Sequence, residues 1–589
     1  MSARPLAAEE QDEKGLDWRL TKRLLLRARD QWPQLALAAG LLLLISLGEQ
    51  ARPLMVKIMV DLALQGDVSG VLSWAPMFLV SILLVFGLQT WQTIQTKTMG
   101  QDLMLDLRTA LFTKIHAQPL RYFDKNPVGS LMTRVVYDVE TLNQFFTAGV
   151  SAVFQDCFTL LVIGGLMLKL DWRLGLVGLG MLPLLFWSTM LFRKRARENS
   201  RAVRKNNSAM NAFLNENLGG MATVQLFNRE GRNAAKFDGI NRASLDILLK
   251  QIKINAFFLP FAELLGAFTV GLLLWLGGLR HLQGGLTLGV VVASVMYVQR
   301  LYEPLRDLTQ KFEIFQSAMS SSERIFALLD RQEEVEDPQH PLAPRPIQGE
   351  LAFEHVSFAY DEGRDVLHDV SFHIPAGARV AVVGPTGSGK TSLTNVLLRF
   401  YPLGRGRVLL DGQPLQDYAR ADYRRSFALV PQDPFLFSGS LLENLRLSDA
   451  SIPRERVEWA CAQVRADAFI RQLPGGYDAL LNEGGSNLST GQKQLLAFAR
   501  ALVFDPRVLI LDEATASVDT ATEAEIQQAL EVLLQGRSSI TIAHRLSTVR
   551  DADVILVLKD GRLAEQGSHA QLMAAGGLYR DLIELQFKD

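Results

Sequence analysis

Six long apolar stretches in the first half of the chain constrain its fold most strongly. They cover residues 33–56, 71–96, 145–168, 173–193, 258–280 and 285–304. A helix needs about 20 mostly apolar residues to cross a bilayer, and each stretch comes close to that length. The 589-residue chain is 48% hydrophobic and only 21% charged, which agrees with a part that lies in lipid and excludes a wholly soluble or disordered protein.

Basic residues between these stretches predict how they are oriented. Lys and Arg collect in segments 97–144 and 194–257, whereas the opposite loops contribute only Lys169, Arg173 and Arg280 at their edges. Cytoplasmic loops carry the excess of Lys and Arg, so the two long segments are predicted to be cytoplasmic. Six spans place both ends on one side. No cleavable signal is expected, because about thirty mostly polar residues, acidic ones included, precede the first apolar run.

A proline-broken segment separates the two halves of the chain. Its prolines are Pro338, Pro341, Pro344 and Pro346. Because proline interrupts helices, we expect a linker here. The predicted organisation is a cytoplasmic segment (1–30), a six-helix membrane domain with long cytoplasmic extensions (31–315), a linker (316–348) and a second domain (349–589).

The second domain alternates short β-rich runs with helical stretches. Four of the runs are apolar enough to be buried parallel strands: 378–383, 427–430, 508–511 and 539–543. This alternation predicts an α/β domain of about 240 residues. The predicted fold class is therefore an α-helical transmembrane domain fused to an α/β domain.

The sequence from Gly384 to Thr391 fits the phosphate-loop pattern GxxxxGK[ST], after one predicted strand and at the start of a helix. Its glycines let backbone N–H groups approach phosphates, Lys390 reaches the β- and γ-phosphates, and the Thr391 hydroxyl serves Mg²⁺. ATP and Mg²⁺ are the predicted cofactors. The residues predicted to hold the phosphates are Gly384, Pro385, Thr386, Gly387, Ser388, Gly389, Lys390, Thr391 and Ser392.

Polar residues follow three other predicted strands. Asp512 and Glu513 end an apolar run, where an Asp can hold Mg²⁺ and the adjacent Glu can polarise the attacking water. Gln432 and His544 end two further strands, where ligands gather in such sheets. Together, Gln432 and His544 favour a sensor of the γ-phosphate. The predicted metal ligands are Thr391, Gln432 and Asp512. Alternatives remain open at this point: a solvated acidic turn after the strand, or a structural histidine.

The sequence Leu488-Ser-Thr-Gly-Gln492 resembles the signature motif of ATP-binding cassette (ABC) proteins. The resemblance covers the whole chain, because six spans followed by one nucleotide domain is the arrangement of a type I ABC exporter half-transporter. Within the family, the chain is most similar to one half of the bacterial heterodimeric multidrug exporters.

The resemblance assigns a role to each matching residue. It implies that Tyr360 stacks on adenine, with an ordinary surface tyrosine as the alternative. It makes Glu513, His544 and Lys390 the catalytic residues, with His544 as the switch histidine. The remaining nucleotide contacts implied are Gln432 of the Q-loop, Ser489, Gly491 and Gln492 of the signature, and Asp519 of the D-loop.

The resemblance also implies a partner chain, because each ATP is held between the phosphate loop of one chain and the signature serine of another. Exporters usually have glycine where this chain has Thr490, and arginine where it has Leu495. A side chain at 490 crowds backbone that should approach phosphate. We therefore expect a heterodimer with a second half-transporter, with a homodimer as the alternative. Segments 122–127 and 220–224 resemble coupling helices, or are plain helical tips.

The function implied is ATP-driven export of small amphipathic, multidrug-type compounds across the bacterial inner membrane, with both termini cytoplasmic and lipids as neighbours. A lipid or peptide exporter, or an ATP-gated channel or regulator, remains an alternative. The formal net charge of −1 gives no basis for binding nucleic acid. Asp156 lies mid-span, where a charge is costly, so we expect it either to receive cationic compounds or to fix helix packing.

Overall fold

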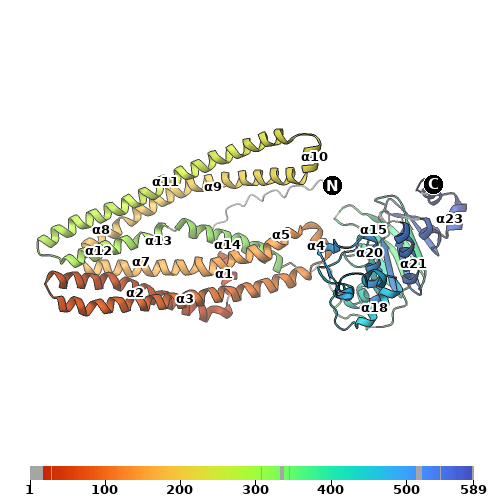
Figure 1. Ribbon diagram of the computed structural model, residues 1–589, viewed down its shortest axis with the longest axis horizontal. Coiled ribbons are helices and arrows are strands. Elements are labelled where there is room, and N and C mark those ends of the chain that lie inside the picture. The colour runs from red at the N-terminus through yellow and green to blue at the C-terminus, as the bar shows by residue number, and fades with distance from the viewer. Residues whose placement is uncertain are drawn as a thin grey trace. The chain divides into compact units, whose positions relative to one another are not determined.

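A computed structural model describes residues 18–586 except 28, 307, 332–336, 344, 362, 513–519 and 544–545. The chain divides into two compact units (Figure 1). The first comprises Met1–His116 and Val128–Arg331, and the second comprises Ala117–Pro127 and Gln332–Asp589.

The described part of the first unit is helical. Its helices are α1 (Trp18–Arg27), α2 (Trp32–Leu64), α3 (Val68–His116), α5 (Val128–Thr133), α6 (Val139–Gln144), α7 (Ser151–Leu170), α8 (Trp172–Gly180), α9 (Leu182–Gly219), α10 (Met221–Leu226), α11 (Glu230–Leu282), α12 (Leu288–Leu301), α13 (Glu303–Arg306) and α14 (Leu308–Leu329). Two π-helical turns, Arg134–Asp138 and Phe145–Val150, lie on either side of α6. The π-turns let α5, α6 and α7 continue one another as a single rod (Figure 1).

Five helical stretches in the described residues are long and apolar enough to cross a membrane, and they cover the first five predicted spans. The sixth predicted span, 285–304, is divided between α12 and α13. Helix α12 has 14 residues, about 21 Å at 1.5 Å per residue, which is shorter than a bilayer core. Pro304 lacks the N–H that would continue the helix, which explains why the break falls here.

Two aspartates fix the short turns between the membrane helices. The Asp171 carboxylate accepts hydrogen bonds from two backbone N–H groups at the start of α8, and it pairs with Arg280 of α11. The Asp61 carboxylate accepts hydrogen bonds at 2.9 Å from the backbone N–H of Gly289 and from the Thr287 hydroxyl, at the start of α12. Each aspartate supplies an acceptor to N–H groups that a helix leaves unpaired at its start.

The second unit is α/β. Its strands are β1 (Leu351–Phe358), β2 (Leu367–Ile374), β3 (Arg379–Val383), β4 (Arg405–Leu410), β5 (Gln413–Pro414), β6 (Phe427–Val430), β7 (Gly439–Ser440), β8 (Leu480–Leu481), β9 (Val508–Asp512), β10 (Ser538–Ile542), β11 (Val554–Lys559) and β12 (Arg562–Gly567). Its helices are α4 (Leu120–Lys125), α15 (Lys390–Leu397), α16 (Arg420–Arg425), α17 (Leu441–Arg446), α18 (Arg454–Gln463), α19 (Asp467–Ile470), α20 (Thr490–Phe504), α21 (Thr520–Leu534), α22 (Leu546–Arg550), α23 (His569–Ala575) and α24 (Leu578–Gln586).

The larger sheet has the order β12-β11-β3-β10-β9-β6, and every neighbouring pair is parallel except β11 with β12. A second, antiparallel sheet has the order β2-β1-β4-β5. One apolar core lies between the two sheets and includes α15, while a separate core joins α17, α18 and α20 to β9. The four predicted strands correspond to β3, β6, β9 and β10, so the predicted fold class is confirmed.

The connection between the units differs in detail from a simple linker. Helix α14 continues to Leu329, so the predicted linker 316–348 starts inside a helix. The described residues from 337 to 350 contain no helix or strand. Helix α4, which the sequence places between two membrane spans, belongs to the second unit by its contacts.

Candidate nucleotide-binding site

The parallel strands bring the predicted site to one edge of the sheet. Ile542 of β10 is in register with Val382 of β3 and with Asp512 of β9. The loops that follow neighbouring parallel strands leave at the same edge, where ligands bind in such sheets. The predicted catalytic Glu513 and His544 lie outside the described residues, as does Asp519.

Strand β6 adds a fourth segment to this edge. Val430 is in register with Leu511 of β9. Gln432 follows two residues later and is exposed. The order β3-β10-β9-β6 therefore places the phosphate loop, the end of β9 and the predicted Q-loop at the same edge of the sheet.

Three glycines of the phosphate loop have positive φ, but for different reasons. A Cβ on Gly384 would lie 2.2 Å from the backbone oxygen of Leu558, and a Cβ on Gly389 would lie 2.7 Å from the Leu367 side chain. Both positions are closed by the protein itself. A Cβ on Gly387, at φ +83°, would meet nothing within 4 Å. The middle of the loop therefore faces open space, as a phosphate site requires.

Lys390 is the first residue of α15, and its ammonium lies over the loop. It donates hydrogen bonds to the backbone oxygens of Gly384 at 2.8 Å and of Pro385 at 3.0 Å. Burial lowers the pKa of Lys390, and the Asp512 carboxylate partly offsets this effect. A half-buried ammonium beside the loop backbone and a nearby acid provides the positive charge that a polyphosphate needs.

The hydroxyls of the loop differ in burial. Ser388 is 3% exposed, and its hydroxyl oxygen has no hydrogen-bond partner among the described residues. A buried hydroxyl without a partner is uncommon and fits a site completed by a ligand. Ser392 is also buried, whereas Thr391 and Thr386 are exposed. The loop thus fits a nucleotide on three observations: open space at Gly387, the Lys390 ammonium and the Ser388 hydroxyl.

The predicted Mg²⁺ ligands come from three segments: Thr391 from α15, Gln432 after β6 and Asp512 at the end of β9. Among the described residues there is no group of three or more His, Cys, Asp or Glu side chains that could hold a metal ion. Mg²⁺ usually binds one or two protein side chains together with water and substrate phosphates, so this donor set fits Mg²⁺ bound with ATP and not a resident ion.

Tyr360 is half-buried in a cluster of aromatic rings. Its ring contacts Phe358 and Tyr401 edge-to-face, with centroids 4.8 and 4.9 Å apart. Its hydroxyl donates a hydrogen bond to Ser392 at 3.1 Å and accepts one from Asn395 at 3.0 Å. These contacts hold the ring beside the phosphate-loop helix, where the sequence predicts an adenine platform.

Sequence reasoning missed how α4 joins this cluster. The Tyr401 hydroxyl donates a hydrogen bond to the Asp124 carboxylate of α4. The Lys125 ammonium pairs with Asp361 at 2.7 Å and lowers the pKa of that carboxyl. Because Tyr401 also contacts Tyr360, the predicted adenine platform is two contacts away from α4.

The second predicted coupling segment is found in the first unit. It lies in α10, which has no buried residue. Three large apolar side chains around it are exposed: Leu218 (65%), Leu226 (76%) and Phe227 (64%). Exposed apolar residues at a helical tip mark a surface suited to a protein contact.

The signature residues form the start of α20. The Ser489 hydroxyl accepts a hydrogen bond from the Gln492 backbone N–H at 3.2 Å, and the Gln492 side chain accepts one from the Ser489 N–H at 3.0 Å. This capping box fixes the helix start. Gly491 is buried, and the Thr490 side chain is exposed. Leu495 is 2% exposed and belongs to the core around α20, so packing explains an apolar residue there.

Asp156 of α7 pairs with Lys311 of α14. The exposed fractions of the two side chains are 25% and 18%. Closer to the C-terminal end of α14, Arg324 pairs with Asp138 at 2.5 Å. These pairs join α14 to the rod of α5–α7 at two levels, which supports the packing role of Asp156 over an open carboxylate for cations.

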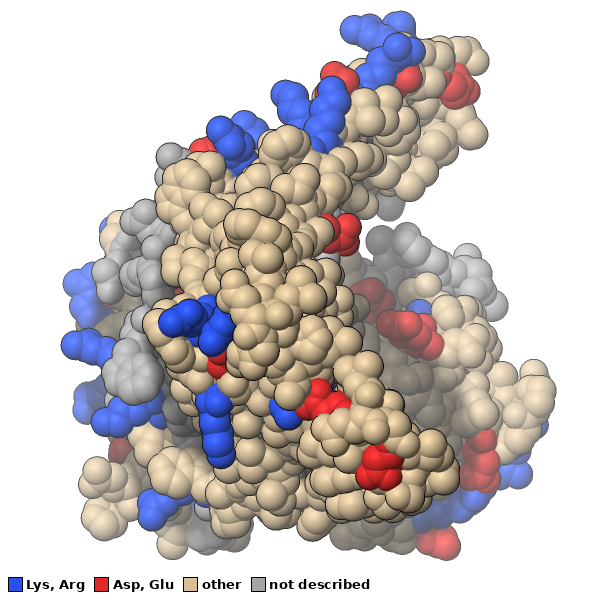
Figure 2. All heavy atoms as spheres, turned by 90° about the vertical axis from the view of Figure 1, so that its left-hand side faces the viewer, with Lys and Arg blue, Asp and Glu red and all other residues tan. Residues whose placement is uncertain are grey.

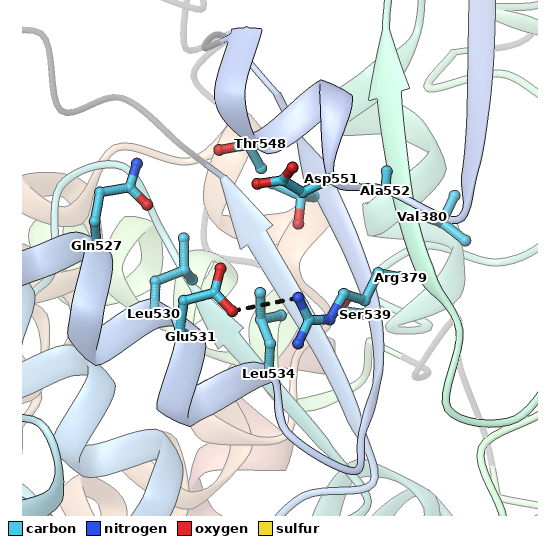
Figure 3. A pocket seen from close by; sticks show the side chains of 11 residues that line it. Arg379, Val380, Gln527, Leu530, Glu531, Leu534, Ser539, Thr548, Asp551 and Ala552 are labelled. Carbon is cyan, nitrogen blue, oxygen red and sulfur yellow. Dashed lines mark hydrogen bonds and ion pairs between the residues drawn. The ribbon is translucent and has the colours of Figure 1, made fainter. Parts of the chain in front are cut away.

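A small cavity in the second unit is separate from the phosphate loop (Figure 3). Its volume of about 40 Å³ accommodates a few water molecules but not a nucleotide. Side chains of α21 and of β3 and β10 line it, and Glu531 pairs with Arg379 across it at 3.4 Å. It offers no alternative nucleotide site.

Comparison with known proteins agrees with this geometry. Residues 35–305 match the ABC transporter transmembrane region, and residues 367–516 match the ABC transporter family. An ATP-dependent lipid A-core flippase of Syntrophus aciditrophicus (strain SB) is 33% identical over 96% of this chain and 94% of its own length. YheH of Bacillus subtilis (strain 168), named a probable multidrug resistance ABC transporter ATP-binding/permease protein, is 36% identical over 86% of this chain and 75% of its own length.

A solved structure shares the fold. It is a bacterial Atm1-family ABC exporter with ATP bound, 29% identical, and it covers 95% of this chain and 99% of its own with a TM-score of 0.78. In the present chain, one transmembrane region is fused to one nucleotide-binding domain. The chain therefore belongs to the ABC transporter family, as a half-transporter of an ATP-hydrolysing exporter that works as a dimer.

Proposed function

We propose that this chain exports small amphipathic, multidrug-type compounds across the bacterial inner membrane, with both termini cytoplasmic, as one half of a heterodimer. The resemblance to MdlB, one half of a bacterial heterodimeric multidrug exporter, belongs to this proposal. The observation that carries it is the open phosphate loop around Gly387 and Lys390, in a chain that also holds the membrane helices.

We assign the chemistry to residues at one sheet edge. The phosphate-loop N–H groups and Lys390 hold the β- and γ-phosphates, and Thr391, Gln432 and Asp512 bind Mg²⁺. Bound Mg²⁺ neutralises developing charge on the phosphates. Glu513 orients the attacking water and His544 contacts the γ-phosphate. The fold of the chain holds these side chains and N–H groups at one edge of the sheet before ATP binds.

The remaining nucleotide contacts are assigned to two chains. Tyr360 stacks on the adenine of the ATP held by the same chain. Ser489, Gly491 and Gln492 close on the ATP of the partner chain, and we assign Asp519 to the nucleotide contacts as the D-loop aspartate that the family resemblance implies. The phosphate loop precedes α15 and the signature starts α20, and these two helices pack in separate apolar cores.

We favour a heterodimer because of Thr490. Its side chain is exposed at the start of α20, where a partner-bound phosphate would approach the helix N–H groups. That signature would face a degenerate site, while Lys390 and Glu513 serve the competent one. Affinity purification from mild detergent tests this. A second, related polypeptide in equal amount is expected, and a pure homodimer with full ATP hydrolysis and transport would contradict the pairing.

The domain limits stay part of the proposal: a cytoplasmic segment 1–30, a membrane domain 31–315, a connecting segment 316–348 that begins within α14, and a nucleotide-binding domain 349–589. Limited proteolysis of the detergent-solubilised protein tests them. Cleavage is expected within 330–348, and protection of that segment with cleavage inside 349–589 would move the boundary.

A lipid exporter is the second candidate. It is favoured by the relative named a lipid A-core flippase and by the pairing of Asp156 with Lys311, which leaves no net charge for a cation. Transport into inside-out vesicles separates the two. ATP-dependent accumulation of a cationic dye supports multidrug export, whereas movement of a labelled lipid without dye accumulation supports lipid export. Asp156→Asn is expected to lower the apparent unfolding temperature and to leave dye transport, measured at equal protein level, close to that of the wild type.

A further inference from the structure

The membrane unit contains an open cavity of about 630 Å³ that the features above do not use. It lies where α2, α7 and the turn between α11 and α12 meet. These helix ends face the viewer in Figure 2, where charged side chains are scattered over a mostly uncharged surface. The volume is within the range of sites that bind a ligand of some tens of atoms, about 300–1,000 Å³.

Most of the cavity wall is apolar. The side chains of Leu54, Leu166, Leu170, Leu286 and Val290 line it, and they come from α2, α7, α12 and the turn before α12. Such a wall provides little to a small inorganic anion, because it has few groups that can replace water around the ion. It suits a hydrocarbon chain, whose burial is favourable in proportion to area.

Two ammonium groups, from Lys57 and Lys169, also line the cavity, together with Gly284, Gly285 and Thr287. Lys57 is 24% exposed in its side chain and pairs with Asp61 at 3.1 Å, but Asp61 also accepts the two hydrogen bonds at the start of α12 described above. Lys169 is exposed, and its side chain forms no ion pair or hydrogen bond with any residue in the described ranges. The cavity therefore combines an apolar wall with positive charge that the protein neutralises only in part.

We propose that this cavity binds one anionic phospholipid, with the phosphate between Lys57 and Lys169 and part of an acyl chain against the leucines. The level is that of the headgroups, because α7 ends at Leu170 and the next residues include Trp172, which is 59% exposed. Lysine and tryptophan near the ends of membrane helices commonly lie at this interface. The proposal does not depend on which compound the transporter exports.

Native mass spectrometry of the purified full-length protein in detergent tests the proposal by titration with dioleoyl-phosphatidylglycerol and with neutral dioleoyl-phosphatidylcholine. A basic residue near a membrane surface contributes an attraction worth about a fivefold change in binding. We expect Lys169→Gln to weaken binding of the first phosphatidylglycerol about fivefold and to leave phosphatidylcholine binding unchanged. Arg173→Gln is the matched control, since Arg173 is exposed and does not line the cavity.

Three further arms keep the result interpretable. Lys169 is the deciding position, because replacing Lys57 also disturbs Asp61. Leu166→Trp is expected to fill part of the cavity and so to weaken binding of both lipids. Inorganic phosphate at millimolar concentration is expected not to displace the lipid. The proposal is overturned if Lys169→Gln keeps the preference for phosphatidylglycerol, if Arg173→Gln loses it equally, or if phosphate displaces the lipid.

Discussion

Replacing two glycines of the phosphate loop with alanine should impair different properties: Gly384→Ala should lower stability, and Gly387→Ala should weaken ATP binding. The Cβ of Gly384→Ala would lie 2.2 Å from the Leu558 backbone oxygen, about 1 Å closer than an ordinary C···O contact of about 3.3 Å. Overpacking of this kind costs about 1–3 kcal/mol and an unfavourable φ adds about 1–3 kcal/mol. The two costs together are about 2–6 kcal/mol, so at about 2–4 °C per kcal/mol for a unit of this size the apparent unfolding temperature should fall by roughly 4–24 °C.

Gly387→Ala should instead impair binding. Its Cβ meets no atom within 4 Å, so only the left-handed φ of +83° is strained, at about 1 kcal/mol. The methyl group enters the space proposed for phosphate. Losing one charge-assisted hydrogen bond to phosphate costs about 1.5–3 kcal/mol, which weakens ATP binding roughly 10- to 100-fold.

Scanning fluorimetry and titration with a fluorescent ATP analogue, both on the full-length protein in detergent, measure the two effects. The reasoning is refuted if Gly384→Ala unfolds at the wild-type temperature or if Gly387→Ala binds the analogue with wild-type affinity.

Three other predictions concern contacts around the site. Ser489→Ala should destabilise the start of α20 by about 1 kcal/mol and Ser489→Thr by less, as read from the apparent unfolding temperature; equal losses would contradict the capping box. Tyr401→Phe and Asp124→Asn should each reduce substrate-stimulated ATP hydrolysis, and the double variant should be no worse than either alone; additive losses would show that the two side chains act separately. Because the pKa of Asp361 is lowered, its carboxylate stays charged and paired with Lys125 at every pH above the ordinary carboxyl pKa of about 4, and the pair is lost only as the pH falls through the lowered value. Lys125→Gln should therefore change ATP hydrolysis by the same factor at pH 6 and at pH 8.

Features that depend on residues close together in the chain were predictable from the sequence. Strands β3, β6, β9 and β10 and the first five membrane stretches follow from runs of apolar residues. The phosphate loop follows from glycine spacing beside Lys390. In each case the signal lies within a few tens of residues, because strand pairing and helix length depend on local composition and period.

Contacts between distant residues were not predictable. Tyr401 and Asp124 are 277 positions apart, and Lys311 and Asp156 are 155 apart. The sequence predicted for Asp156 either a role in receiving cationic compounds or a packing contact, and it did not identify Lys311 as its partner. Pro304 is present in the sequence, but counting apolar residues does not show that a proline shortens the helix before it. For such distant contacts, the useful signal in the sequence was a single charged residue within an apolar stretch, considered together with its possible partners.

The central claim is that ATP held at this phosphate loop drives transport through the membrane helices. Its most direct test is ATP-dependent accumulation of a fluorescent amphipathic cation, and in parallel of a labelled lipid, by inside-out vesicles that contain the chain and its partner. At equal protein levels, Lys390→Ala should reduce accumulation to that of vesicles lacking the chain, whereas the control Lys250→Ala, at an exposed lysine of α11, should not. Accumulation of either compound at the wild-type rate by Lys390→Ala vesicles would contradict the account.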